Sequence, residues 1–209
     1  MNNYQKIKQE IKTATLVAVS KNRSISQIEE LIDMGVTDFG ENRVREFLDK
    51  WESLPDLNWH FIGQLQTNKV KYLIGKVSLI QSLDSLKLAE EIEKQSQKRQ
   101  MVNDCLIQLK FDDQDVRGGV KLEELPLLYD YCLGCKHLRI RGFMVVAPLG
   151  LKKTKLNEVF HFAYSIYQDY QRKNKDMIYL SMGMSADYEA ALECGSNMVR
   201  IGEKLFTKD

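Results

Sequence analysis

Short apolar runs alternate with longer amphipathic segments along this chain. The runs are five to eight residues long, are rich in Val, Ile, Leu or Phe, and are continuous rather than alternating. A continuous run is typical of a strand that is covered on both faces, as in a parallel sheet. The pattern predicts strands over 15–20, 36–40, 59–63, 77–81, 104–111, 140–146, 177–181 and 197–201.

The segments between these runs carry apolar residues at the spacing of a helix. Residues 25–34 place Ile25, Ile28 and Leu31 on one face, and Ser24 is a candidate N-cap. Residues 86–97 follow the cap candidates Asp84 and Ser85, and the same period recurs over 122–131 and 156–170. The pattern predicts about eight helices in all.

This alternation predicts an α/β fold with parallel strands and right-handed helical crossovers. Eight units favour a closed (β/α)8 TIM barrel, and 209 residues are near the lower limit of ~200 for that fold. The rival is an open doubly wound sheet. We favour the barrel because no GxGxxG follows the first strand, and because polar residues gather where strands end. No linker is visible, so residues 1–209 are expected to form a single domain.

The composition of the chain mainly excludes certain classes of protein. With 30 basic and 29 acidic residues, the chain lacks the basic excess of a dedicated nucleic-acid binder. A hydrophobic content of 44% argues against overall disorder. No apolar run approaches the ~18–20 residues of a membrane span, and the polar first 13 residues do not resemble a secretory signal. We expect a cytoplasmic monomer with no membrane or nucleic-acid partner.

Four cysteines are too few for a disulfide-stapled fold of this length. Cys132 and Cys135 form a CxxC, but Cys132 lies near the end of a predicted helix, whereas a redox CxxC needs its first thiolate at a helix start. A zinc site needs four ligands, and only His137 is near. We interpret the pair as structural.

Lys21 follows the first predicted strand directly, so it is expected to project into the barrel mouth, where active sites of such barrels lie. Partial desolvation there would lower its pKa, and a neutral lysine amine forms Schiff bases with carbonyls such as that of pyridoxal 5′-phosphate, PLP. Position alone is equally compatible with an ordinary surface lysine.

Glycine-bearing loops follow the last two strands, where barrels commonly hold a phosphate. Gly183 and Gly202 let the backbone approach a ligand, and Ser185 is a candidate N-cap for a helix that begins near Ala186. Each loop alone could be a plain turn between a strand and a helix. The two loops together with Lys21 predict a PLP site.

Arg200 ends the last predicted strand. If it faces the barrel interior, its guanidinium could reach the pyridine nitrogen of PLP and, having no acceptor, would keep that nitrogen unprotonated and weaken the ring as an electron sink. The alternative is a structural arginine paired with Glu193 or Glu203.

Six stretches carry a resemblance to a known family: AVSK, FGENRVRE, WHFIGQLQTNK, GFMVVAP, LSMGMSADYEAALECGS and VRIG, which start at residues 18, 39, 59, 142, 180 and 199. In this order and spacing they resemble the YggS/PROSC family of pyridoxal phosphate homeostasis proteins, which are similar to the N-terminal barrel of alanine racemase. The resemblance runs from about Leu16 to Phe206. It implies PLP binding in vitamin B6 homeostasis, supply of PLP to other enzymes and no established turnover, so the protein is not expected to be an enzyme.

The resemblance also implies a role for individual residues. Lys21 would carry PLP as an internal aldimine, and Arg200 would face the pyridine nitrogen. The phosphate would be held by Ser185, Gly202 and the backbone of residue 203. Asn42 would lie beside the cofactor, and His60 and Met182 would line the pocket. The family often has Thr or Ser where this chain has Glu203, so Glu203 is expected to turn outward and to offer only its N–H.

Two enzyme classes remain as alternatives. A PLP-dependent racemase on this barrel would need a second base from another domain, and the chain is expected to have none, because it ends a few residues after the last strand. A Schiff-base aldolase would carry its lysine on a middle strand, with a carboxylate or second lysine deep in the barrel. The length and Arg200 favour a PLP carrier over the racemase, and the paired loops favour it over the aldolase.

Overall fold

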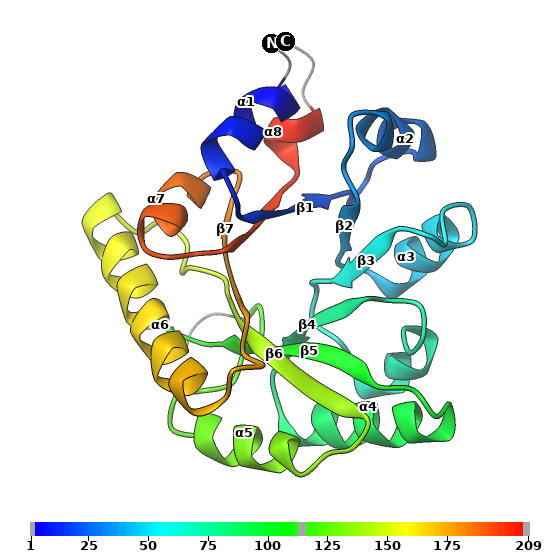
Figure 1. Ribbon diagram of the computed structural model, residues 1–209, viewed down its shortest axis with the longest axis vertical. Coiled ribbons are helices and arrows are strands. Elements are labelled where there is room, and N and C mark those ends of the chain that lie inside the picture. Colours follow the sequence, from blue (N-terminus) through cyan, green and yellow to red (C-terminus); the bar gives the residue numbers. More distant parts are fainter. Residues whose placement is uncertain (1–2, 113–115, 207–209) are drawn as a thin grey trace.

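Eight parallel strands close into a barrel in the computed structural model, which describes residues 3–112 and 116–206 (Figure 1). Each strand pairs with its neighbours in the sequence, and β1 also pairs with β8 to close the ring. This confirms the predicted (β/α)8 barrel and not the open sheet. The strands are β1 Thr15–Val19, β2 Asp38–Glu41, β3 Asn58–Phe61, β4 Leu79–Leu83, β5 Asn103–Leu109, β6 Leu138–Val145, β7 Tyr179–Met184 and β8 Met198–Ile201.

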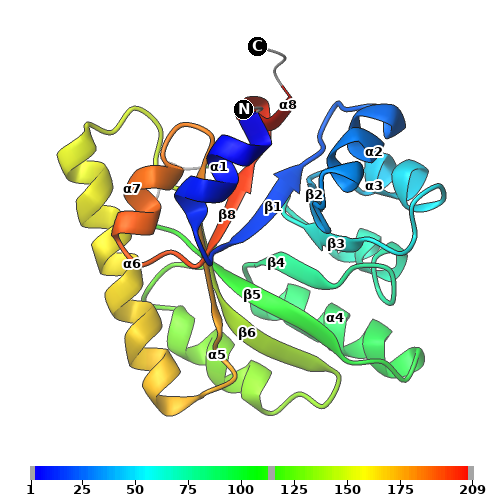
Figure 2. The ribbon, with the colours of Figure 1, turned by 45° about the horizontal axis from the view of Figure 1, so that its top comes forward.

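Helices surround the strands on the outside of the barrel (Figure 1). They are α1 Asn3–Ile11, α2 Ile25–Asp33, α3 Val44–Trp51, α4 Leu86–Lys98, α5 Leu125–Leu133, α6 Lys153–Lys173, α7 Tyr188–Glu193 and α8 Glu203–Phe206, and a 3-10 helix, η1 Thr67–Tyr72, follows β3. Helix α1 precedes β1 and packs beside α8 (Figure 2). Within the described ranges, no helix is both long enough and apolar enough to cross a membrane.

Several strands are displaced by about two residues from the apolar runs that predict them. Strand β2 starts at Asp38 rather than Val36, and β7 starts at Tyr179 rather than Met177. Val36 and Met177 are nonetheless buried, and the Met177 carbonyl accepts a hydrogen bond from Tyr167. An apolar run therefore marks where the chain becomes buried. In these two segments the chain is buried before the strand begins to pair with its neighbours.

The helix starts agree with the predicted caps at two places. The Ser24 hydroxyl accepts a hydrogen bond from the Gln27 N–H in a capping box, and the Ser85 hydroxyl accepts one from the Leu88 N–H. Helix α5 begins later than predicted, at Leu125, with a proline in its first turn. Proline is favoured there because its fixed φ suits a helix and its missing N–H would have no partner.

Two hydrophobic cores lie on the two sides of the sheet. The larger core lies between strands and helices and includes Phe39, Trp59, Phe61 and Phe143, all fully buried. The smaller core fills the barrel interior with Val17, Leu79, Leu106, Met144 and Met198. Successive strand residues alternate between these cores. On β8, Val199 and Ile201 belong to the larger core while Met198 belongs to the inner one, so Arg200 shares the inward side.

Candidate functional site

Lys21 lies in a turn just beyond β1, at the end of the barrel where the carboxyl ends of the strands gather, here called the mouth. Its side chain is exposed, so the prediction that Lys21 is partly desolvated is wrong for this structure. The reason is that β1 ends at Val19, and the turn carries Lys21 out past the rim. No hydrogen bond or ion pair joins the ammonium to any residue in the described ranges, which leaves the amine accessible.

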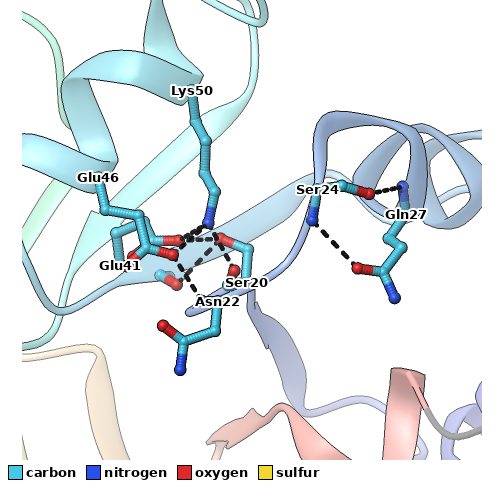
Figure 3. Close-up of polar contacts among 8 residues, drawn as sticks. Ser20, Asn22, Ser24, Gln27, Glu41, Glu46 and Lys50 are labelled. Atoms are coloured by element: carbon cyan, nitrogen blue, oxygen red, sulfur yellow. Dashed lines mark hydrogen bonds and ion pairs between the residues drawn. The ribbon is translucent and has the colours of Figure 1, made fainter.

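A buried ionic cluster lies directly beside this turn (Figure 3). Lys50 of α3 donates from Nζ to Glu41 Oε1 at 2.5 Å, to Glu46 Oε1 at 2.8 Å and to the Ser20 carbonyl at 2.6 Å. The Ser20 hydroxyl also donates to Glu41, at 2.6 Å. Burial raises the pKa of Glu41, although Lys50 and Ser20 oppose this by hydrogen bonding. The sequence prediction missed this cluster; its signal was the i,i+4 spacing of Glu46 and Lys50.

Asn42 follows β2 directly, at the same end of the barrel as Lys21. Its Oδ1 is buried and has no hydrogen-bond partner in the part of the chain that is described. A buried amide oxygen without a donor is costly in free energy, by about 1–3 kcal/mol. The atom is therefore suited to accept a hydrogen bond from a ligand or water at the mouth.

The loops after β7 and β8 are brought together, as expected. The Gly202 N–H donates to the Ser185 hydroxyl at 3.3 Å. Gly202 also packs closely on β1, since a Cβ added there would lie 3.0 Å from the Val19 carbonyl oxygen. Gly183 has φ +97° and lies against Tyr188 and Ala191 of α7, where a Cβ would meet atoms closer than 3.0 Å.

Ser185 does not cap the next helix, contrary to the prediction. Helix α7 begins at Tyr188, not near Ala186, and its N-cap is Asp187. The Asp187 carboxylate instead accepts a hydrogen bond of 2.6 Å from the Met184 N–H and closes the turn. This leaves the Ser185 hydroxyl directed at the Gly202 backbone. Glu203 begins α8 with an exposed side chain, which agrees with its expected outward orientation.

Arg200 is buried in the barrel interior with its guanidinium hydrogen-bonded to main-chain and hydroxyl oxygens. Nη1 donates to Ser181 O at 2.8 Å and to Ser181 Oγ at 2.7 Å, and Nη2 donates to Val145 O at 2.8 Å. Neither Glu193 nor Glu203 pairs with it. Burial lowers the pKa of Arg200 to about 10, an effect partly offset by the charge of Asp187. A guanidinium has five N–H donors, so two have no hydrogen-bond partner among the described residues.

A hydrogen-bond chain continues from Arg200 across the barrel. The Ser181 hydroxyl donates to Gln81 Oε1 at 2.7 Å, and Gln81 Nε2 lies 2.8 Å from His60 Nδ1. His60 Nε2 in turn lies 3.1 Å from Oδ1 of Asp38, the first residue of β2. We call these five residues the interior chain. Burial raises the pKa of Asp38, but hydrogen bonds from His60 and Thr37 outweigh it, and the net shift is downward.

Two predicted pocket residues are not at the mouth. His60 is 3% exposed and sits inside the barrel, between Gln81 and Asp38. Met182 is fully buried in the larger core, because it points away from the barrel interior toward the helices. In this structure neither side chain offers surface to a ligand, but His60 is connected to Arg200 through the interior chain.

The CxxC is structural in its geometry. Cys132 is the penultimate residue of α5 and is buried, and both thiols are free. Burial raises the pKa of Cys132 to about 12 and that of Cys135 to about 11. His137 is hydrogen-bonded to Glu93 at 3.0 Å. No group of three or more His, Cys, Asp or Glu suited to a metal occurs among the described residues.

Comparison with known proteins shows the family to which this chain belongs. The family model of the alanine racemase N-terminal domain matches residues 1–208. The pyridoxal phosphate homeostasis protein of Aquifex aeolicus is 43% identical over 196 residues, which is 92% of this chain and 86% of that protein. The protein of the same name from Synechocystis sp. is 35% identical over 198 residues, 91% of this chain and 89% of that one. The chain belongs to the pyridoxal phosphate homeostasis protein family.

Solved structures agree with membership of the homeostasis protein family. PipY of Synechococcus elongatus, determined with PLP bound, is 31% identical, with a TM-score of 0.91 and coverage of 98% of both chains. Alanine racemase of Clostridium difficile is 16% identical with a TM-score of 0.82, and this chain spans 58% of it. At that identity the racemase shows only that the barrel fold is shared.

Proposed function

We propose that this protein binds PLP in vitamin B6 homeostasis, holding the cofactor covalently on Lys21 without catalytic turnover. The observation that carries the proposal is that the neighbouring strands β7, β8 and β1 bring to one end of the barrel two joined glycine-bearing loops, a buried arginine and an accessible lysine. The homeostasis proteins to which the chain is similar, and PipY with PLP bound, support it.

The residues present fit this cofactor. PLP supplies an aldehyde, which condenses with an amine as one water molecule leaves. Lys21 provides the accessible amine. We assign the phosphate to the Ser185 hydroxyl and the Gly202 backbone, an assignment supported by the hydrogen bond that joins the two loops. The two remaining donors of Arg200 suit the pyridine nitrogen, and the unpartnered Asn42 Oδ1 suits a donor nearby.

The covalent assignment is tested by mass spectrometry after borohydride reduction. PLP added to the purified protein should give a reduced adduct on the peptide that contains Lys21, and Lys21→Ala should abolish it. Lys87→Ala is the matched control, because Lys87 is an exposed lysine in the first turn of α4, at the same end of the barrel. A reducible adduct of unchanged yield in Lys21→Ala would refute the assignment.

The absence of turnover is a separate part of the proposal. The alternative function is a PLP-dependent amino-acid racemase, which the shared barrel fold suggests. The loaded protein should not interconvert D- and L-alanine at enzyme-like rates. A turnover of about 1 per second, the low end for ordinary enzymes, would overturn the carrier proposal in favour of the racemase.

We further propose that the protein acts as a cytoplasmic monomer that passes PLP to apo-enzymes. Its four free cysteines are in keeping with a reducing compartment. In a transfer assay, an apo-enzyme should regain activity faster from the loaded protein than from the same concentration of free PLP. Equal or slower recovery would argue against direct delivery.

A further inference from the structure

Both peptide bonds of Lys21 are held by the buried ionic cluster. The Ser20 carbonyl belongs to the peptide bond before Lys21 and accepts a hydrogen bond from Lys50 at 2.6 Å. The Asn22 N–H belongs to the peptide bond after Lys21 and donates to Glu46 Oε1 at 2.5 Å. Because Lys50 also binds Glu46 at 2.8 Å, the two contacts form one clamp (Figure 3).

We propose that Lys50 is a positioning residue for Lys21, acting through Glu46 and the backbone. The inference rests on the proposed function, since it concerns how Lys21 presents its amine to PLP. Lys50 itself is 6% exposed and lies behind the turn. All three hydrogen bonds found for its ammonium go to Glu41, Glu46 and the Ser20 carbonyl.

The turn is closed by a hydrogen bond of 2.9 Å from the Arg23 N–H to the Ser20 carbonyl, and the clamp adds side-chain contacts to that same carbonyl and to the Asn22 N–H. No described residue makes a hydrogen bond or ion pair with the ammonium, so the backbone of the turn is what sets the direction in which the Lys21 side chain leaves the chain. Asn22 has φ +58°, in the left-handed region that asparagine tolerates better than most residues. The contact between Asn22 N–H and Glu46 supports this conformation together with the backbone hydrogen bond from Arg23 to Ser20.

A contribution to fold stability does not by itself explain why these charged side chains are buried together. Taking charged groups out of water costs several kcal/mol per ion, and a buried ion pair is often no more stabilising than apolar residues of similar size. One Glu41 oxygen, Oε2, is buried and has no partner among the residues that the structure describes. The cluster does, however, place a donor and an acceptor on the two sides of one residue, which an apolar cluster cannot do.

The experiment separates covalent capture from binding. Capture is measured as the rate constant for formation of the borohydride-reducible Lys21 adduct. Binding is measured with 4′-deoxypyridoxine 5′-phosphate, which keeps the phosphate and ring but has no aldehyde. Glu46→Ala removes the clamp on Asn22 and leaves the pair of Lys50 and Glu41. The fold should therefore be retained. Glu46→Gln keeps an acceptor oxygen, and Glu158→Ala removes the partner of an exposed lysine, Lys155, on α6.

Glu46→Ala and Lys50→Met should slow capture by about tenfold or more, because displacement of a reacting group by about 1 Å costs up to ~100-fold. Binding of the aldehyde-free analogue should change less than about twofold, and Glu46→Gln should restore most of the capture rate. Unchanged capture in folded Glu46→Ala, or an equal loss of analogue binding, would overturn the positioning role. If the unsubstituted protein formed no adduct on Lys21, the proposed function itself would fail.

Discussion

Arg200 on β8 donates a 2.7 Å hydrogen bond to the hydroxyl of Ser181 on β7, and this contact sets the direction of the whole interior chain. Arginine has only donors, so the Ser181 hydroxyl proton is free to donate onward to Gln81 Oε1. The Gln81 amide nitrogen then donates to His60 Nδ1, and His60 carries its proton on Nε2, toward Asp38. Each donor therefore points from the cation near the mouth to the carboxylate at the opposite end.

The middle of this chain should be sensitive to loss of hydrogen bonding. Gln81→Leu keeps a similar volume but leaves the Ser181 hydroxyl without an acceptor and His60 Nδ1 without a donor. Since a buried unsatisfied polar group costs about 1–3 kcal/mol, the free energy of unfolding should fall by roughly 2 kcal/mol or more. Urea titration followed by circular dichroism measures it.

The matched control is Gln95→Leu on α4, where a partly buried glutamine bonds only to Glu91 within the same helix. A surface change of this kind should alter the free energy of unfolding by less than about 0.5 kcal/mol. If the two substitutions lowered the free energy of unfolding equally, the hydrogen bonds of the interior chain would contribute no more to stability than one within a helix.

Asp38 links the stability of the fold to pH. Its pKa is lowered from 3.8 on folding, so the ionised form stabilises the native state above the unfolded pKa, and this contribution is lost as pH falls through the folded pKa. In Asp38→Asn the amide oxygen still accepts from His60, but the charge is gone. The variant should be less stable than the parent near pH 7, and the difference should shrink as the pH falls below 3.8 and through the lowered pKa of folded Asp38.

Urea midpoints measured from pH 7 down to the lowest pH at which both proteins stay folded test this. Glu93, whose pKa is also lowered by its hydrogen bonds to His137 and the backbone despite the opposing effect of burial, provides the control. Glu93→Gln should show its own pH-dependent difference without altering PLP binding. Curves for Asp38→Asn that run parallel to the parent at every pH would contradict the linkage.

The sequence predicted the barrel and the strand-end positions, because both depend on local patterns of apolar runs and periodicity. Lys21, Ser185 and Gly202 are found at the ends of β1, β7 and β8 for that reason. The burial of Arg200 inside the barrel could also be inferred from its place between Val199 and Ile201.

Contacts that span the barrel could not be predicted from local patterns. The Ser181 hydroxyl meets Gln81 across 100 positions of sequence, and Lys50 reaches the Ser20 carbonyl across 30. Helix α7 begins after Asp187 rather than after Ser185, because the Asp187 carboxylate closes the preceding turn on the Met184 N–H, a contact that cap preferences do not predict. His60 was placed at the mouth by its motif, whereas its orientation is determined by Asp38 and Gln81.

The CxxC thiols should be unreactive in the native state. Since burial raises the pKa of Cys132 to about 12 and that of Cys135 to about 11, the reactive thiolate is scarce at neutral pH. Iodoacetamide near pH 7.5 should modify these residues slowly in the folded protein and rapidly in urea, as read by peptide mass spectrometry. Rapid labelling of folded Cys132 would point instead to a redox role.

Removal of the Ser185 hydroxyl should weaken retention of PLP without preventing covalent capture. Ser185→Ala deletes the group that joins the two loops through the Gly202 N–H, and one hydrogen bond is worth about 1 kcal/mol, or about fivefold in affinity. Equilibrium dialysis with 4′-deoxypyridoxine 5′-phosphate measures this loss, while the Lys21 adduct should still form. Ser165→Ala is the control, because that hydroxyl bonds only to a carbonyl of α6. Equal affinities in the two variants would remove Ser185 from the phosphate site.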